Sequence, residues 1–144
     1  MKKLANNLLI FGSLQTVAMA IYHFMIPIQF NWSNYLLETS PTINWALYSI
    51  HNYFCFNLLV VSSFLLFFLV KRKESTQTIK TLSQIIVLFW IFSFIYQIID
   101  PMPLPERLSF LTILLPGMAL INAIVFIIPL KLSFKGKTLS VIAN

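Results

Sequence analysis

The side chains of this sequence that could do chemistry are few, and they gather at one end of its apolar segments. Both histidines lie there, with three of the four carboxylates, Glu38, Asp100 and Glu106. Two imidazoles from different helices can share a metal ion or supply both axial ligands of a haem, and a carboxylate can complete or orient such a site. The candidate metal ligands are therefore His23, His51, Asp100 and Glu106.

The same groups allow two other interpretations. A histidine can act as a general base with a carboxylate partner, on a lipid-soluble substrate. The sequence has no HxxxH or HExxH spacing, no nucleophile elbow and no phosphate-binding loop to support such a reaction. In the simplest interpretation the histidines are interface anchors, Asp100 ends a helix before Pro101, and Glu106 suits the positive end of the next helix. These patterns specify neither a catalytic residue nor a cofactor.

Polar side chains recur on one face of three predicted helices. With 3.6 residues per turn, such faces include Tyr22 and His23 in the first helix, Tyr48, His51 and Asn52 in the second, and Tyr96, Gln97 and Asp100 in the third. Polar and ionisable residues inside membrane spans usually face the protein interior or a wet cavity. We therefore expect a polar pocket, and its candidate ligand-binding residues are Tyr22, His23, Tyr48, His51, Asn52, Tyr96, Gln97 and Asp100.

The elements that must position these residues are predicted to be membrane-spanning helices. The chain has 144 residues, of which 58% are hydrophobic and 10% charged, with a mean hydropathy of +0.83. Soluble domains carry about 25% charged residues, and a helix of about 20 apolar residues crosses a bilayer. Four segments are long enough, at about residues 8–26, 45–70, 82–99 and 108–130. Together with their short connectors and ends, these spans account for residues 1–144, so we expect a single membrane domain.

Charge placement predicts how these spans are oriented. Of the ten lysines and arginines, only Arg107 lies in the predicted outer loops, residues 27–44 and 100–107, whereas the inner loop, residues 71–81, and both termini are basic. The positive-inside rule then places the N-terminus and the C-terminus in the cytoplasm. Because the connectors are short, consecutive spans must be neighbours. The predicted fold is an all-α antiparallel four-helix transmembrane bundle, in an inner membrane of bacterial type.

The first span also fits a different role. Lys2 and Lys3 precede an apolar core that reaches Ala18-Met19-Ala20, which is the order of features in a cleavable signal peptide. The apolar pattern continues to Ile26, which favours a retained helix.

In the fourth span, Pro116-Gly117 is typical of a kink, which opens a cavity or improves packing.

The composition also restricts the partners. The net charge of +6 arises from residues that flank apolar segments, without a basic patch interleaved with aromatic residues, so nucleic acid is not an expected partner. Cys55 is the single cysteine, which excludes an internal disulfide. Asn57 and Asn122 lie deep in their spans, where amides are expected to form interhelical hydrogen bonds. The expected partners are the lipid bilayer and other membrane subunits or further copies of this chain.

Two functions remain open at this point. The first is a membrane protein whose outer polar pocket binds a small or lipidic ligand, or which serves as a subunit of a membrane complex. The alternative is a membrane-embedded enzyme or redox subunit that uses His23 and His51 as metal or haem ligands or as a general base. A channel would require several copies to line a pore.

Overall fold

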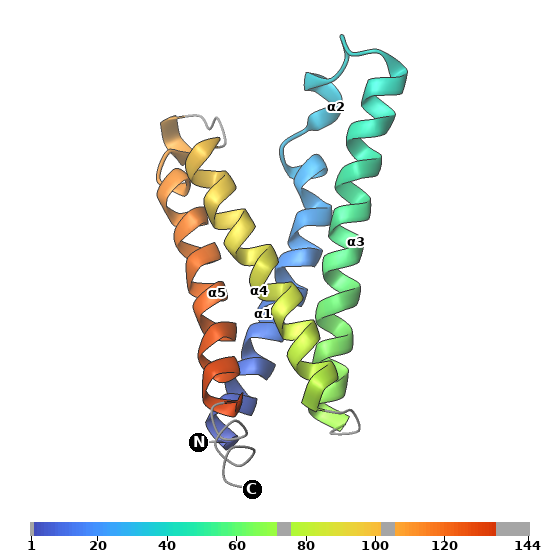
Figure 1. The fold of residues 1–144 in the computed structure, drawn as a ribbon. Helices are drawn as coiled ribbons and strands as arrows, with labels where there is room; N and C mark the ends of the chain where they lie inside the picture. Colours follow the sequence, from blue (N-terminus) through green and yellow to red (C-terminus); the bar gives the residue numbers. More distant parts are fainter. Residues whose placement is uncertain (1, 72–75, 102–105, 135–144) are drawn as a thin grey trace, which may run out of the picture.

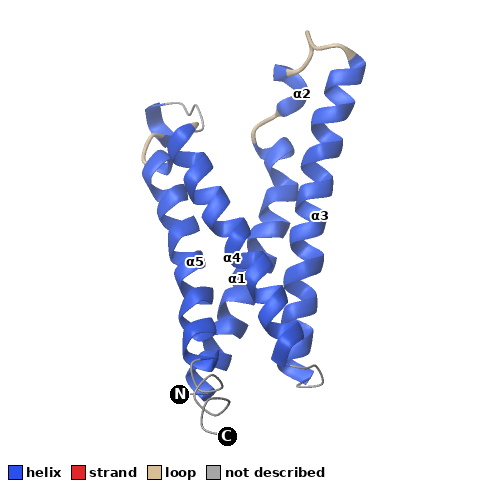
Figure 2. Cartoon of the chain, viewed as in Figure 1, coloured by secondary structure: helices blue, strands red, loops and turns tan. Residues whose placement is uncertain are grey.

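All secondary structure of the described residues is helical. The computed structural model describes residues 2–71, 76–101 and 106–134. Its helices are α1 (Lys2–Gln29), α2 (Trp32–Tyr35), α3 (Pro41–Lys71), α4 (Thr76–Ile99), a 3-10 turn η1 (Glu106–Leu108) and α5 (Leu111–Phe134) (Figure 2). Helices α1, α3, α4 and α5 are long and apolar enough to cross a membrane.

Some helices begin or end at residues other than those expected from the sequence, and proline and serine lie at these ends. Helix α1 continues through Pro27 to Gln29, and α3 begins at Pro41, four residues before the expected start at residue 45. Proline suits the first position of a helix because no donor is needed there. Ser40 caps this end, since its Oγ accepts a hydrogen bond of 3.3 Å from the Ile43 amide. Residue 108 belongs to η1, so α5 starts later than expected.

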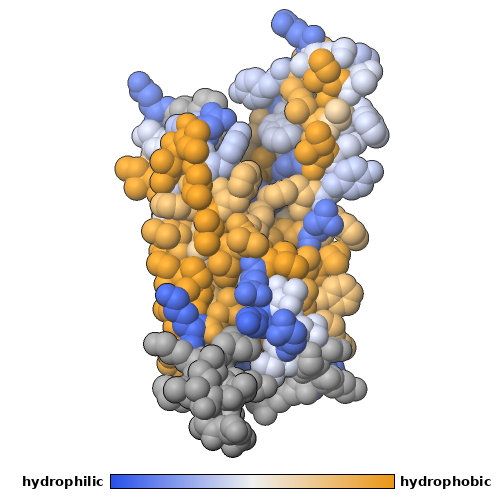
Figure 3. Space-filling model, in the orientation of Figure 1, coloured by the Kyte–Doolittle hydropathy of each residue, from blue (hydrophilic) through white to orange (hydrophobic). Residues whose placement is uncertain are grey.

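The four long helices pack side by side as two pairs. Helix α1 contacts α3 and α5, and α4 also contacts α3 and α5. Figure 1 shows that the α1–α3 pair and the α4–α5 pair converge near the start of α1 and separate toward the end that carries α2. The middle of the surface shown in Figure 3 is mainly hydrophobic. This surface is what a lipid environment requires, because exposed apolar side chains on all four long helices would be unfavourable in water.

The tightly packed core occupies the converging half of the molecule. Gly12 lets α1 approach α5, because a Cβ atom at this position would lie 2.9 Å from Cε2 of the fully buried Phe126. All four long helices contribute to this core, which comprises Leu9, Leu65, Leu69, Ile86, Trp90, Ala119, Ala123 and Phe126. The diverging half has no comparable cluster among the described residues, and space for a cavity is left there.

The two deep asparagines have different environments. Asn122 of α5 is fully buried, and neither atom of its amide group has a hydrogen-bond partner among the described residues. Asn57, at the middle of α3, is exposed on the outside of the helices. The interhelical hydrogen bonds expected for these two amides are therefore not formed within the described part of this single chain.

Candidate functional site

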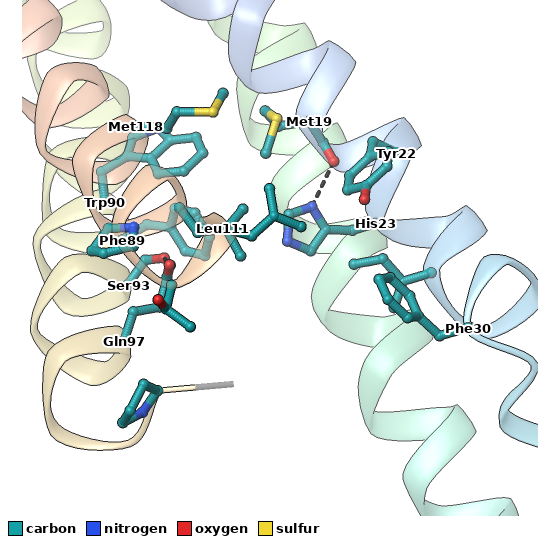
Figure 4. A pocket seen from close by; sticks show the side chains of 15 residues that line it. Met19, Tyr22, His23, Phe30, Phe89, Trp90, Ser93, Gln97, Leu111 and Met118 are labelled. Carbon is teal, nitrogen blue, oxygen red and sulfur yellow. Dashed lines mark hydrogen bonds between the residues drawn. The ribbon is translucent and has the colours of Figure 1, made fainter. Parts of the chain in front are cut away.

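A cavity of about 220 Å³ lies between α1, α4 and α5 in the diverging half (Figure 4). Most of its lining is apolar. The lining residues are Met19, Tyr22, His23, Ile26 and Phe30 of α1, Phe89, Trp90, Ser93 and Gln97 of α4, Pro101 after α4, and Leu111, Thr112, Leu115, Pro116 and Met118 of α5. Such a lining, with a few polar atoms, is typical of a site for a lipid-soluble molecule.

Three of the expected ligand-binding residues line this cavity, and the other five do not. Tyr22, His23 and Gln97 belong to its wall. Helix α3 supplies none of the lining residues, and α5 takes the place that the polar face of α3 was expected to fill. The residues that lie elsewhere are Tyr48, His51, Asn52, Tyr96 and Asp100.

His23 presents a hydrogen-bond acceptor to the cavity. Its Nδ1 atom lies 2.7 Å from the carbonyl oxygen of Met19, one helical turn earlier. Because a carbonyl oxygen only accepts, Nδ1 carries the proton, and in the neutral ring Nε2 keeps a free lone pair. Figure 4 shows this ring projecting from α1 toward the side where α4 and α5 lie. The local helical contact therefore sets both the orientation and the tautomer of the imidazole.

Gln97 contributes a second acceptor from the opposite wall. Its Nε2 donates to Oγ of Ser93 at 2.8 Å, one turn earlier on α4. Its Oε1 is buried and has no hydrogen-bond partner among the described residues. Buried polar atoms are nearly always paired, so an unpaired atom in a cavity wall requires an explanation. A bound molecule that donates a hydrogen bond provides one.

His51 has a structural contact that depends on Pro27. Proline has no amide hydrogen, so the carbonyl of His23, four residues earlier, loses its normal helical partner. Nε2 of His51 lies 2.8 Å from this carbonyl oxygen and donates to it. The same ring lies 3.6 Å from Sγ of Cys55 and has its centroid 5.0 Å from that of Trp32. His51 therefore ties α3 to α1 and is not directed into the cavity.

The remaining candidates lie on the surface or at helix ends. The hydroxyl of Tyr96 donates to Oδ2 of Asp100 at 2.9 Å, and both residues are exposed. Tyr48 packs its ring 5.8 Å from the ring of Trp32, which connects α3 with α2. Asn52 and Glu106 are exposed. Within residues 2–71, 76–101 and 106–134, no three His, Cys, Asp or Glu side chains are arranged to hold a metal ion.

Sequence reasoning missed the wall that α5 supplies. The clue was the pair Thr112 and Pro116, which are separated by four residues and both line the cavity. Pro116 cannot donate to the Thr112 carbonyl, so another main-chain acceptor loses its helical partner at this wall. Comparison of the chain with protein-family models, with curated proteins and with solved structures returned no match.

Proposed function

We propose that this protein is a small integral membrane protein that binds a lipid-soluble molecule in the cavity between α1, α4 and α5. The observation that carries the proposal is an apolar cavity with the acceptor Nε2 of His23 on one wall and a buried, unpaired acceptor, Oε1 of Gln97, within the facing wall. Its volume of about 220 Å³ is below the roughly 300 to 1,000 Å³ of typical ligand pockets. The cavity therefore suits a single small molecule or the head of a longer amphiphile.

The proposed setting is an inner membrane, with both termini in the cytoplasm and the four long helices as an antiparallel bundle. Charge supports this orientation, because Lys3, Lys71, Lys80 and Lys131 all lie toward one end of the long helices. The cavity lies toward the opposite end, near α2, so it would be reached from the outer leaflet. A molecule dissolved in the bilayer could then enter without crossing water.

The proposed partner is a second copy of the chain or another membrane subunit. Asn57 supports this proposal, because it exposes an amide at the middle of α3, where lipid offers no hydrogen bond. An amide both donates and accepts, so two copies of Asn57 could satisfy each other. This surface lies outside the cavity, and the two proposals are tested separately.

The experiment that tests the proposed function is analysis of protein purified in mild detergent. We expect an organic extract of the wild-type protein to contain a lipid-soluble molecule in about stoichiometric amount, identified by mass spectrometry. His23→Leu is expected to lose it, because this change removes an acceptor and leaves an apolar wall. Asn52→Leu is the control, because Asn52 is exposed on α3 and outside the cavity.

The same samples test the alternative function. An absorption spectrum and elemental analysis would detect a haem or a bound metal. A Soret band, or a stoichiometric metal lost in both His23→Leu and His51→Leu, would contradict the proposed function and favour a redox subunit. Equal amounts of extracted molecules in the wild type and His23→Leu would also contradict it, since they would be bound elsewhere on the protein.

A further inference from the structure

Among the described residues that line the cavity, hydrogen-bond acceptors exceed donors. Its free acceptors are Nε2 of His23 and Oε1 of Gln97. The donors in its wall are used elsewhere, because the Trp90 indole donates to Thr16 at 3.2 Å and the Thr112 hydroxyl donates to the Ser109 carbonyl at 2.6 Å. One of the two N–H groups of the Gln97 amide is used by Ser93, and the second remains as a donor.

The remaining hydroxyl groups do not change this balance. Tyr22 and Ser93 line the cavity, and a hydroxyl both donates and accepts. Pro116 also lines the cavity and has no amide hydrogen, so it adds no donor to the wall. An occupant that only accepts, such as an ether or an ester, could pair with a hydroxyl or with the second N–H of Gln97, but it would leave Nε2 of His23 and Oε1 of Gln97 unpaired.

We propose that the cavity selects molecules that carry a hydroxyl donor on an apolar body, of the alcohol or phenol class. This inference rests on the proposed function and adds the chemistry of the occupant. A site built to accept a hydrogen bond discriminates strongly against an analogue that cannot donate one, because its buried acceptors then stay unpaired. The hydroxyl would bond to His23 or Gln97 while the apolar body lies against Met19, Phe89 and Met118.

The test uses two probes that differ in the donor alone. Para-bromophenol has a hydroxyl where para-bromoanisole has a methyl ether, and the bromine of each quenches tryptophan fluorescence. Trp90 lines the cavity, and the other tryptophans are Trp32 and Trp45. Full-length protein with Trp32→Phe and Trp45→Phe, in phosphatidylcholine vesicles, therefore reports binding through Trp90 alone.

A second protein corrects for partition of the probes into the bilayer. Trp45 is 68% exposed and lies outside the cavity, so a Trp32→Phe, Trp90→Phe protein reports partition without cavity binding. After this correction, we expect the phenol to bind Trp90 protein about tenfold more tightly than the anisole. His23→Phe is expected to reduce this preference to about twofold, and Gln97→Leu to reduce it as well. Asn52→Leu, an exposed position of α3 outside the cavity, is expected to keep it.

Each other outcome overturns a specific statement. If the two probes quench Trp90 equally after the correction for partition, the hydroxyl inference is overturned and the cavity remains a binding site. If neither probe quenches Trp90 more than its partition into the bilayer predicts, the proposed function is overturned as well. A short bromoalkanol, compared with its own methyl ether, distinguishes the two sources of the hydroxyl. A larger preference in the aliphatic pair indicates a lipid alcohol, and a larger preference in the aromatic pair indicates a phenol or quinol.

Discussion

Two histidines that look alike in the sequence have different tasks because of one proline. Pro27 leaves the carbonyl of His23 without a helical donor, and His51 of α3 donates to it at 2.8 Å. His23 itself bonds within its own helix through Nδ1 and keeps Nε2 for the cavity. His51 therefore connects two helices, whereas His23 carries a nitrogen that can bind a ligand.

This assignment predicts that the cost of replacing His51 depends on residue 27. We expect His51→Phe to lower the free energy of unfolding by about 1 kcal/mol, because a carbonyl is left unpaired in an apolar environment. In a Pro27→Ala background the helix supplies its own amide to that carbonyl, so the same change is expected to cost less than half as much. Thermal unfolding in detergent measures both values in a double-mutant cycle.

Asn52→Leu serves as the control for this cycle, since Asn52 is an exposed neighbour of His51 on the same helix. Its effect is expected to be small and equal in the two backgrounds. If His51→Phe lowers the free energy of unfolding equally with proline and with alanine at position 27, His51 does not act through the His23 carbonyl.

At the scale of the elements, the approach of α1 to α5 depends on a missing side chain. A Cβ at Gly12 would lie 2.9 Å from Cε2 of Phe126 and 3.0 Å from Cγ1 of Val125. Phe126 is fully buried in the core, so its ring has little room to move aside. The close contact holds together the half of the molecule that supports the cavity.

Gly12→Ala is therefore expected to destabilise the protein by about 1 to 3 kcal/mol, the usual cost of overpacking a core. Gly117→Ala is the matched control, because a Cβ there meets no atom within 4 Å. Alanine also favours helix, so the control is expected to be neutral or slightly stabilising. Thermal unfolding compares the two, and Phe126→Leu is expected to restore part of the loss at Gly12. Equal effects of the two substitutions would mean that the α1–α5 contact is not limiting.

The exposed face of α3 gives the second prediction about an element. We expect Asn57→Leu to weaken self-association by about 1 kcal/mol, since interhelical hydrogen bonds in membranes contribute about 0.6 kcal/mol each and a symmetric pair has two. Energy transfer between labelled copies in vesicles, over a range of protein-to-lipid ratios, measures this change.

Gln84→Leu makes the same kind of change on the exposed surface of α4 and is the control. It is expected to leave self-association unchanged, and neither substitution is expected to alter quenching of Trp90. Self-association that is unaffected by Asn57→Leu would exclude this face as the contact between copies.

At the scale of the whole molecule, the orientation in the membrane decides which side can supply the occupant. Leu37 is 77% exposed between α2 and α3, and Lys71 is exposed at the other end of α3. In a Cys55→Ala background, we expect Leu37→Cys to react with a membrane-impermeant maleimide in intact cells. Lys71→Cys is expected to react only after permeabilisation. The opposite pattern would reverse the orientation and open the cavity toward the cytoplasm.

The sequence by itself determined the helices. Long apolar runs leave a backbone in lipid no partners except its own, so helix is the structure that satisfies them. Proline and polar residues mark most of the helix ends, and α4 ends at Ile99, where Asp100 and Pro101 predicted that it would. The same local reasoning placed Tyr22, His23 and Gln97 on polar helix faces, and these three residues line the cavity.

Only the tertiary structure decided which helical faces meet. In a membrane, lipid is as apolar as a leucine-rich core, so a hydrophobic pattern does not distinguish an inward face from an outward one. Helix rotation is set instead by contacts between residues far apart in the sequence, such as Gly12 with Phe126 and His51 with the carbonyl of His23. These contacts put α5 rather than α3 at the cavity, because the close approach at Gly12 brings α5 against the face of α1 that carries His23.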